Sequence, residues 1–166
     1  MRASAPVDAD AFKQSLRSVA ASVAVVTTRA GPLRAGLTTM SVCSVSAEPP
    51  AMLACINREA SAEAIVARSG RFAINFLTEA QHAIARLFSQ PRLDADRRFA
   101  EGTWITLVTG APVLQGAAAS FDCEVQQRLP AGTHILYIGR VVAVDRLPAD
   151  TLLYRNGLFR RLVQVE

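Results

Sequence analysis

Two long β-type runs constrain the fold of this chain more than any other feature of its sequence. They span Ala117–Arg128 and Thr133–Val144, and the short segment Leu129–Gly132 joins them. The second run is rich in β-branched and aromatic residues, and the joining segment holds a proline and a glycine, which favour a turn. Long strands with so short a connection pair as antiparallel neighbours. The sequence therefore predicts a fold built on antiparallel β-structure.

Shorter β-type segments follow one another along the rest of the chain. In order they are Ser22–Thr28, Arg34–Met40, Ser41–Ser46, Met52–Ile56, Phe72–Leu77, Leu152–Arg155 and Leu158–Val163. Asn156–Gly157, between the last two, is the strongest short-range hairpin signal. The pattern predicts an antiparallel β-barrel decorated by helices. We expect a single domain over residues 1–166, with residues 1–7 frayed.

Three helices are predicted between the strands. Asp8 or Asp10 caps the first, and Ser61 caps the second, which ends at Gly70. The capping-box pattern Thr78–Gln81 opens the third. The apolar stripe of the first helix consists of Phe12, Leu16, Val19 and Val23. The apolar face of the third consists of Ile84, Leu87 and Phe88.

Composition limits the classes of function. Charged residues make up 19% of the chain, below the usual quarter or so, which predicts that part of the surface is buried in an oligomer. The net charge of +4 is spread over scattered arginines without a basic block, so no nucleic-acid partner is expected. Apolar runs are short and no signal-peptide pattern is present, so we expect no membrane association and a cytoplasmic protein.

The number and spacing of cysteines and histidines limit the disulfides and metal sites that the chain can form. Cys43, Cys55 and Cys123 lack Cys-x-x-Cys spacing and are expected to be reduced and buried. With two histidines in the chain and no cluster of histidine, cysteine and carboxylate residues, zinc or non-haem iron lacks credible ligands. No metal site is therefore expected.

The stretch from Gly36 to Ser61 carries the strongest functional signal. Both faces of Thr38–Ser46 are small or hydroxylic, whereas strands usually alternate apolar and polar residues. Such a strand suits a flat ligand with polar edges. Asn57-Arg58-x-x-Ser61 then places a cation before a helix start, which is typical of an anion site. A planar ring followed by a phosphate is the ligand that this order suggests.

At these residues the chain resembles the short-chain flavin reductases, which supply reduced flavin to two-component monooxygenases such as the 4-hydroxyphenylacetate 3-monooxygenase system. The resemblance implies an FMN-binding split β-barrel, a homodimer with flavin near the subunit interface, and a flavin-dependent monooxygenase as partner. The matching motifs are Gly36-Leu-Thr, Val42-Cys-Ser-Val-Ser, Pro49-Pro50, Cys55-Ile-Asn-Arg, Gly70-Arg-Phe-Ala-Ile-Asn and Gly132-Thr-His.

The flavin-binding residues are predicted in two groups. The first consists of Thr38, Thr39, Met40, Ser41 and Ser44, where exposed backbone would pair with the pyrimidine edge of the flavin ring. The competing interpretation is an ordinary strand with solvent-facing hydroxyls. The second group, which the family places near the flavin phosphate, consists of Asn57, Arg58 and Ser61. Its competing interpretation is a polar loop with Ser61 as a helix cap.

His134 is the predicted catalytic residue, since the family carries a histidine there that faces the nicotinamide. A structural histidine is the alternative. Tyr154 and Arg155 are predicted to help hold the nicotinamide cofactor, although turn chemistry alone explains the Asn156–Gly157 hairpin. Candidates to flank the ribityl or adenine part of the flavin are Phe88, which also suits the core, and the pair Arg98 and Phe99 in the predicted loop Pro91–Thr103.

Taken together, the sequence predicts an NAD(P)H:flavin oxidoreductase. The protein would orient a nicotinamide against the flavin for hydride transfer and limit access of water. FMN against FAD, and NADH against NADPH, stay open at this point. One alternative is an FMN-bound reductase of another acceptor, such as a cobalt-corrin. Another is a non-catalytic flavin-binding module.

Overall fold

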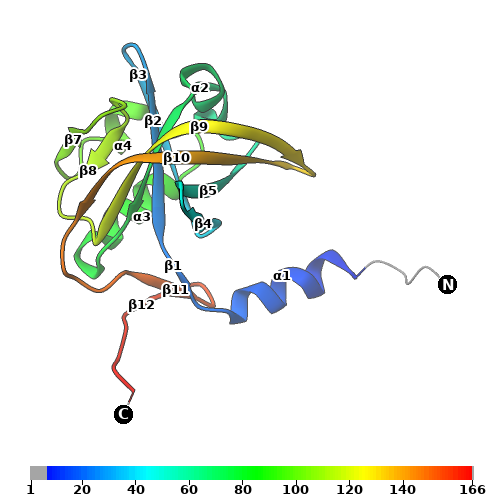
Figure 1. Ribbon diagram of the computed structural model, residues 1–166. Helices are drawn as coiled ribbons and strands as arrows, with labels where there is room; N and C mark the ends of the chain where they lie inside the picture. Colours follow the sequence, from blue (N-terminus) through cyan, green and yellow to red (C-terminus); the bar gives the residue numbers. More distant parts are fainter. Residues whose placement is uncertain (1–6, 166) are drawn as a thin grey trace.

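A seven-stranded antiparallel sheet organises the computed structural model, which describes residues 7–165 (Figure 1). The strand order is β3-β2-β6-β9-β10-β5-β4. The prediction of a mainly antiparallel β fold with a few helices is confirmed. The predicted fraying of residues 1–7 falls outside the described range except at Val7, which is exposed and precedes the first helix. The strands are β2 (Ala24–Ala30), β3 (Leu33–Thr39), β4 (Val42–Ala47), β5 (Pro50–Asn57), β6 (Arg71–Phe76), β9 (Ala119–Ala131) and β10 (His134–Arg146).

The two edge strands of this sheet are consecutive in the chain. Only Met40 and Ser41 separate the end of β3 at Thr39 from the start of β4 at Val42. Three peptide units span at most about 11 Å, so the two edges of the sheet must approach each other at this end. Because β3 and β4 stand at opposite ends of the strand order, the sheet curls into a barrel that is split along this seam, as predicted.

The longest pairing is between β9 and β10, the two runs that dominate the sequence. They are joined by a two-residue turn at Gly132 and Thr133, with Gly132 at φ 55°. The predicted turn at Leu129–Gly132 was too long, because Leu129 and Pro130 lie within β9 and pair with β10. Pairing of β9 with β6 ends at Glu124, so Pro130 needs no donor on that side and is tolerated.

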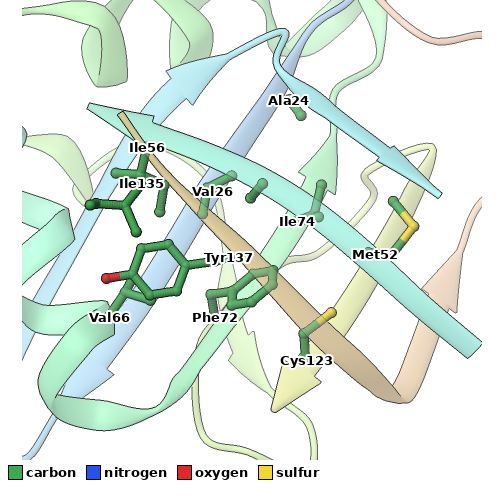
Figure 2. Close-up of a cluster of buried hydrophobic side chains, with 11 residues drawn as sticks. Ala24, Val26, Met52, Ile56, Val66, Phe72, Ile74, Cys123, Ile135 and Tyr137 are labelled. Carbon is green, nitrogen blue, oxygen red and sulfur yellow. The ribbon is translucent and has the colours of Figure 1, made fainter. Parts of the chain in front are cut away.

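The barrel interior is filled by one buried cluster (Figure 2). Tyr137 on β10 and Phe72 on β6 are its largest members, both fully buried. A Cβ atom at Gly139 would lie 2.6 Å from Cζ of Phe72, so glycine lets the ring of Phe72 lie against the β10 backbone. The cluster comprises Ala24, Val26, Met52, Ala54, Ile56, Val66, Phe72, Ile74, Cys123, Ile135 and Tyr137.

A second buried cluster lies outside the barrel, under the helices. Phe88, Phe99 and Trp104 pack on one another there, with ring centroids 4.9–5.3 Å apart. The short strands β7 (Trp104–Thr106) and β8 (Pro112–Leu114) border this cluster. They were not predicted, because three residues are too few to show the alternating pattern of a strand. The helices are α1 (Ala9–Ser18), α2 (Ser61–Ser69), α3 (His82–Ser89), which follows a 3₁₀ turn (Glu79–Gln81), and α4 (Ala95–Arg98).

Helix starts and ends only partly follow the prediction. The capping box at Thr78–Gln81 and the left-handed Gly70 after α2 are confirmed. Ser61 does not cap α2: it is the first helical residue, and Ala60 occupies the cap position. Residues 91–103, predicted as a loop, contain the four-residue helix α4, whose first turn is capped by Asp94.

Helix α1 stands away from the body of the molecule (Figure 1). Phe12 and Leu16 lie on its apolar stripe as predicted, and Val19 is the extended residue directly after the helix; the three are 58%, 55% and 61% exposed. Val23 does not belong to this stripe, because the helix ends at Ser18 and Val23 is buried in the second cluster. The apolar stripe of α1 is therefore left uncovered by the rest of residues 7–165.

A small three-stranded sheet anchors both ends of the described chain. It consists of β1 (Ala21–Ser22), β11 (Leu153–Arg155) and β12 (Leu158–Arg160). Asn156 and Gly157 form the predicted hairpin turn, with φ of 51° and 80°, as a type I′ turn requires. The Asn156 amide donates to the Arg17 carbonyl at 2.9 Å, which ties the end of α1 to this hairpin.

Cysteine burial differs from the prediction. All three cysteines are free, but Cys123 alone is fully buried, whereas Cys55 is half-buried and Cys43 is exposed. The reason is that β4 is an edge strand with almost every residue exposed. No helix within residues 7–165 has the length and apolar character needed to cross a membrane.

Candidate functional site

A cleft of about 680 Å³ opens at the start of α2, between that helix, the end of β3 and the segment that links α3 to α4. We call it the α2 cleft. Small-ligand sites commonly measure about 300–1,000 Å³, so its size suits a mononucleotide. Five of the predicted site residues line it: Thr38, Asn57, Ser61, Phe88 and Arg98.

The first turn of α2 leaves backbone donors available to this cleft. Ala60 at the cap position offers no side-chain acceptor, whereas Asp8 caps α1 by accepting from two amides at 3.1 Å. The Glu63 amide bonds the Ala60 carbonyl at 2.9 Å. The amides of Ser61 and Ala62 are thus left to an outside acceptor at the positive end of the helix dipole, an arrangement that favours an anion.

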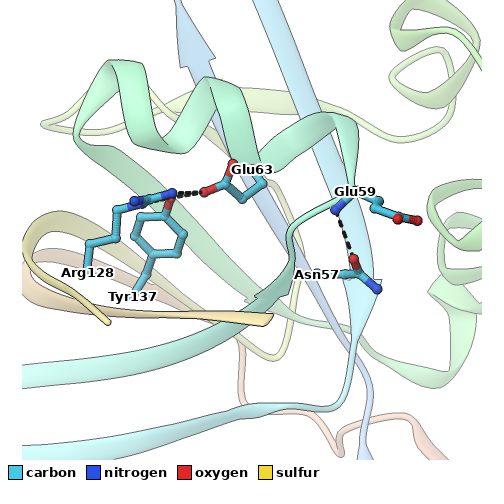
Figure 3. Close-up of polar contacts among 5 residues, drawn as sticks. All are labelled: Asn57, Glu59, Glu63, Arg128 and Tyr137. Atoms are coloured by element: carbon cyan, nitrogen blue, oxygen red, sulfur yellow. Dashed lines mark hydrogen bonds and ion pairs between the residues drawn. The ribbon is translucent and has the colours of Figure 1, made fainter. Parts of the chain in front are cut away.

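The loop before α2 is held rigidly and joins the cleft to the β9–β10 turn. The Asn57 side-chain oxygen accepts from the Glu59 amide at 2.9 Å (Figure 3). The Arg58 amide donates to the Thr133 carbonyl at 3.0 Å, and His134 pairs with Asn57 across the sheet. The structure therefore brings three predicted site residues, Asn57, Arg58 and His134, to one rim of the barrel.

His134 itself is half-buried at this rim. Its Nδ1 lies 2.9 Å from the Thr133 hydroxyl, which fixes the ring orientation through a neighbouring residue. Arg58 is exposed, so its guanidinium is free to approach a ligand. Neither side chain lines the α2 cleft, and both lie beside it.

A closed triangle of hydrogen bonds fixes α2 on the barrel (Figure 3). The Glu63 carboxylate accepts from the Tyr137 hydroxyl and from Arg128, each at 2.7 Å, and Arg128 Nε donates to the Tyr137 oxygen at 3.0 Å. The hydrogen bond from Arg128 is the main cause that lowers the Glu63 pKa, and burial is the main cause that raises the Tyr137 pKa. No local sequence pattern points to these three residues, because they are far apart in the chain and only the fold brings them together.

Arg98 lines the α2 cleft, but its side chain is bonded to the protein backbone. It is 7% exposed, and its guanidinium donates to four carbonyl oxygens, which holds the segment after α3 against β3. The acceptors are Gly36 at 2.9 Å, Phe88 at 3.3 Å, Gln90 at 2.6 Å and Leu93 at 3.0 Å. Burial lowers the Arg98 pKa. Phe88 and Phe99, predicted beside the flavin, are 1% and 5% exposed and form part of the second core cluster.

A second cleft, of about 400 Å³, adjoins the first. We call it the hairpin cleft, because the β11–β12 hairpin forms one wall and α3 and the end of β3 form the others. Thr38 and Ser89 line both clefts. The Thr38 hydroxyl donates to the Ala85 carbonyl at 2.7 Å, which holds β3 against α3. Four of the predicted site residues line the hairpin cleft: Thr38, Thr39, Met40 and Tyr154.

Besides Arg58, His134 and the buried Phe99, three further predicted site residues line neither cleft. Ser41 is exposed just before the edge strand β4, Ser44 is exposed within that strand, and Arg155 is exposed at the end of β11. The Ser41 amide donates to the Thr39 hydroxyl at 3.0 Å, and its carbonyl accepts from the Cys55 amide at 2.9 Å. The backbone of Ser41 is thus largely engaged within the protein.

Comparison with known proteins gives matches over nearly the whole chain. The model of the flavin reductase like domain matches residues 16–163. The FMN reductase (NADH) RutF 1 of Methylorubrum extorquens is 42% identical over 161 residues, which cover 96% of this chain and 80% of that protein.

Solved structures match equally far along the chain. One from Haemophilus somnus 129PT, with a provisional flavin reductase assignment, has a TM-score of 0.91 at 34% identity and covers 94% of this chain and 100% of that one. BorF, the flavin reductase component of a bacterial two-component tryptophan halogenase, has a TM-score of 0.84 at 31% identity, covering 95% of this chain and 100% of BorF. These matches agree with the resemblance that the motifs carry.

Proposed function

This chain belongs to the flavin reductase like domain family, and we propose that it transfers hydride from NADH to FMN. The family and the activity class predicted from the sequence, a nicotinamide-dependent flavin reductase, are thereby confirmed. The choice of NADH and FMN follows the names of the curated relatives. FAD and NADPH, which the sequence left open, are competing ligands for the assays below.

The observation that carries the proposal is the uncapped start of α2 at a cleft large enough for FMN. The amides of Ser61 and Ala62 supply donors for the phosphate, and Arg58 supplies a permanent cation nearby. The ring then extends past Thr38, which lines both clefts, toward Met40 in the hairpin cleft. The residues present therefore fit a flavin mononucleotide.

The chain's own contribution to the reaction is orientation and exclusion of water. When bound, the flavin accepts hydride from the nicotinamide and passes the electrons on. Met40 and Tyr154 shield the hairpin cleft, and Thr38 fixes its floor through Ala85. His134 is proposed to hold the nicotinamide from the barrel rim. Such positioning converts an encounter of two mobile molecules into a reaction within one complex.

The experiment that tests this proposal is NADH oxidation by the purified protein with and without added FMN. Oxidation that requires added FMN supports a reductase that releases reduced flavin. Oxidation by a protein that keeps its flavin supports a bound cofactor that reduces another acceptor, such as a cobalt-corrin. A yellow protein, which holds oxidised flavin, that does not oxidise NADH would indicate a non-catalytic flavin-binding module. Parallel runs with FAD and with NADPH decide the ligand preference.

We propose a flavin-dependent oxygenase or related enzyme as the recipient of reduced flavin. BorF serves a halogenase in a two-component system, and the motif resemblance is to reductases of monooxygenases. The cytoplasmic location expected from the sequence stays a prediction.

We further propose that the protein is a homodimer. Leu53 on β5 and Leu136 and Ile138 on β10 are half-buried on the outer face of the barrel, opposite the core residues of the same strands. The stripe of α1 and this outer face are two apolar surfaces that a second copy can cover. Sedimentation at micromolar concentration should give a dimer. A stable folded monomer of 17.8 kDa would contradict the proposal.

A further inference from the structure

A third cleft, of about 490 Å³, lies between α3 and the end of the chain that includes β12. Its lining includes three arginines, Arg86, Arg160 and Arg161, together with the imidazole of His82. Glu79 is the acid among the lining residues. We call this the arginine cleft.

The positive charge of the arginine cleft is not neutralised within the described part of the chain. The ion pairs of residues 7–165 are Lys13–Asp10, Arg34–Asp96, Arg128–Glu63 and Arg140–Glu124. Arg86 instead lies over the Phe159 ring, 5.5 Å from its centroid, and the His82 ring centroid lies 6.2 Å from the same ring. Three arginines therefore face one carboxylate, which favours a ligand with two negative charges.

The arginine cleft is continuous with the hairpin cleft. Arg86, Leu158 and Phe159 line both, and Phe159 stacks edge-on with Tyr154 at 5.5 Å between centroids. A ligand with a planar ring in the hairpin cleft can thus place its next charged group beside Arg86. In NADH the group that follows the nicotinamide riboside is a diphosphate.

From this continuity we propose that the arginine cleft binds the diphosphate of NADH, with Arg86, Arg160 and Arg161 as the charged donors. The inference rests on the proposed function and adds that the nicotinamide stacks on the part of the flavin ring that extends into the hairpin cleft, on the side of Tyr154. Arginine presents a rigid fork of N–H donors that matches phosphate oxygens, and such charge-assisted bonds are stronger than neutral ones. Arg160 and Arg161 line only this third cleft, so they act on the diphosphate without touching the ring site.

The test compares two hydride donors on the double variant Arg160→Ala, Arg161→Ala. NADH carries the diphosphate, whereas reduced nicotinamide riboside carries no phosphate. We expect the KM for NADH to rise about ten- to hundredfold with kcat little changed, since the lost bonds are made equally in ground and transition states. Efficiency with the riboside should stay within about twofold of wild type. The double variant Arg29→Ala, Arg68→Ala, at two exposed positions outside the cleft, is the control for loss of two charges.

If the double variant loses catalytic efficiency equally with NADH and with the riboside, or loses none with NADH, the proposal is overturned. A much larger loss with NADPH than with NADH would overturn it as well, since the cleft would then bind a 2′-phosphate. Titration calorimetry with ADP-ribose, which keeps the diphosphate but cannot donate hydride, separates this inference from the proposed function. Binding that the double variant abolishes supports the cleft even if the protein reduces no flavin. If the wild-type protein reduces flavin but does not bind ADP-ribose at millimolar concentration, the assignment of the diphosphate to the arginine cleft is refuted.

Discussion

Replacing Ala60 by aspartate should strengthen α2 and weaken FMN binding at the same time. Ala60 precedes the first residue of α2 and offers no side-chain acceptor. Asp8 at the same position of α1 accepts from two backbone amides at 3.1 Å. In Ala60→Asp, the new carboxylate should bond the amides that we assign to the flavin phosphate. The stability of the protein and its affinity for FMN then change in opposite directions.

The size of each change follows from general energetics. A good helix cap in place of alanine stabilises a protein by about 1 kcal/mol. For binding, two unit charges 4 Å apart repel by about 4 kcal/mol at an effective dielectric constant of 20, and one lost charge-assisted hydrogen bond costs about 1.5–3 kcal/mol. Allowing for solvent at the open cleft, we expect a loss of about 3 kcal/mol, which corresponds to an affinity lower by about 150-fold.

The assay is fluorescence titration with FMN and with riboflavin, which lacks the phosphate, beside thermal unfolding of the unliganded protein. Riboflavin affinity should change by less than about threefold. Ala60→Ser, a neutral cap, is the matched control and should lose tenfold or less in FMN affinity. Unchanged FMN affinity in Ala60→Asp, or equal losses for both ligands, would refute the placement of the phosphate at α2.

Three further substitutions test other parts of the account. His134→Ala should lower NADH-dependent flavin reduction about ten- to hundredfold with FMN affinity nearly unchanged, and stopped-flow reduction at an unaltered rate would remove it from the site. Glu63→Gln should lower the melting temperature most at neutral pH: its pKa is depressed in the folded state, so its contribution is complete above the ordinary value of 4.5 and disappears as pH falls through the lower folded value. If the difference in melting temperature between wild type and Glu63→Gln does not become smaller as the pH falls toward 3, this expectation is contradicted. Leu16→Glu on the exposed stripe of α1 should weaken the dimer in sedimentation, whereas Gln14→Glu should not.

Features encoded locally could be predicted from the sequence. The Asn156–Gly157 turn follows from the backbone conformations that these two residues allow, and the end of α2 follows from Gly70 in the left-handed region. The long β9–β10 pair follows from its composition. Motifs also located much of the candidate site, since Asn57, Ser61 and Thr38 line the α2 cleft.

Features that depend on distant partners could not be predicted. Glu63 meets Arg128 and Tyr137 across 65 and 74 residues, and only the strand register brings them together. Arg98 is predicted to flank the ribityl or adenine part of the flavin, yet its guanidinium donates to four backbone carbonyls of the protein itself. The stripe of α1 indicates an apolar face, but no other part of residues 7–165 packs on it, so its proposed partner surface could not be read from local pattern.

The central claim is that this chain reduces FMN with NADH. The most direct measurement is anaerobic mixing of the protein and FMN with NADH, in which a stopped-flow instrument follows the visible absorbance of the oxidised flavin. We expect rapid bleaching whose rate saturates with NADH concentration, with more than one FMN reduced for each protein chain. Bleaching no faster than in a mixture without protein would contradict it.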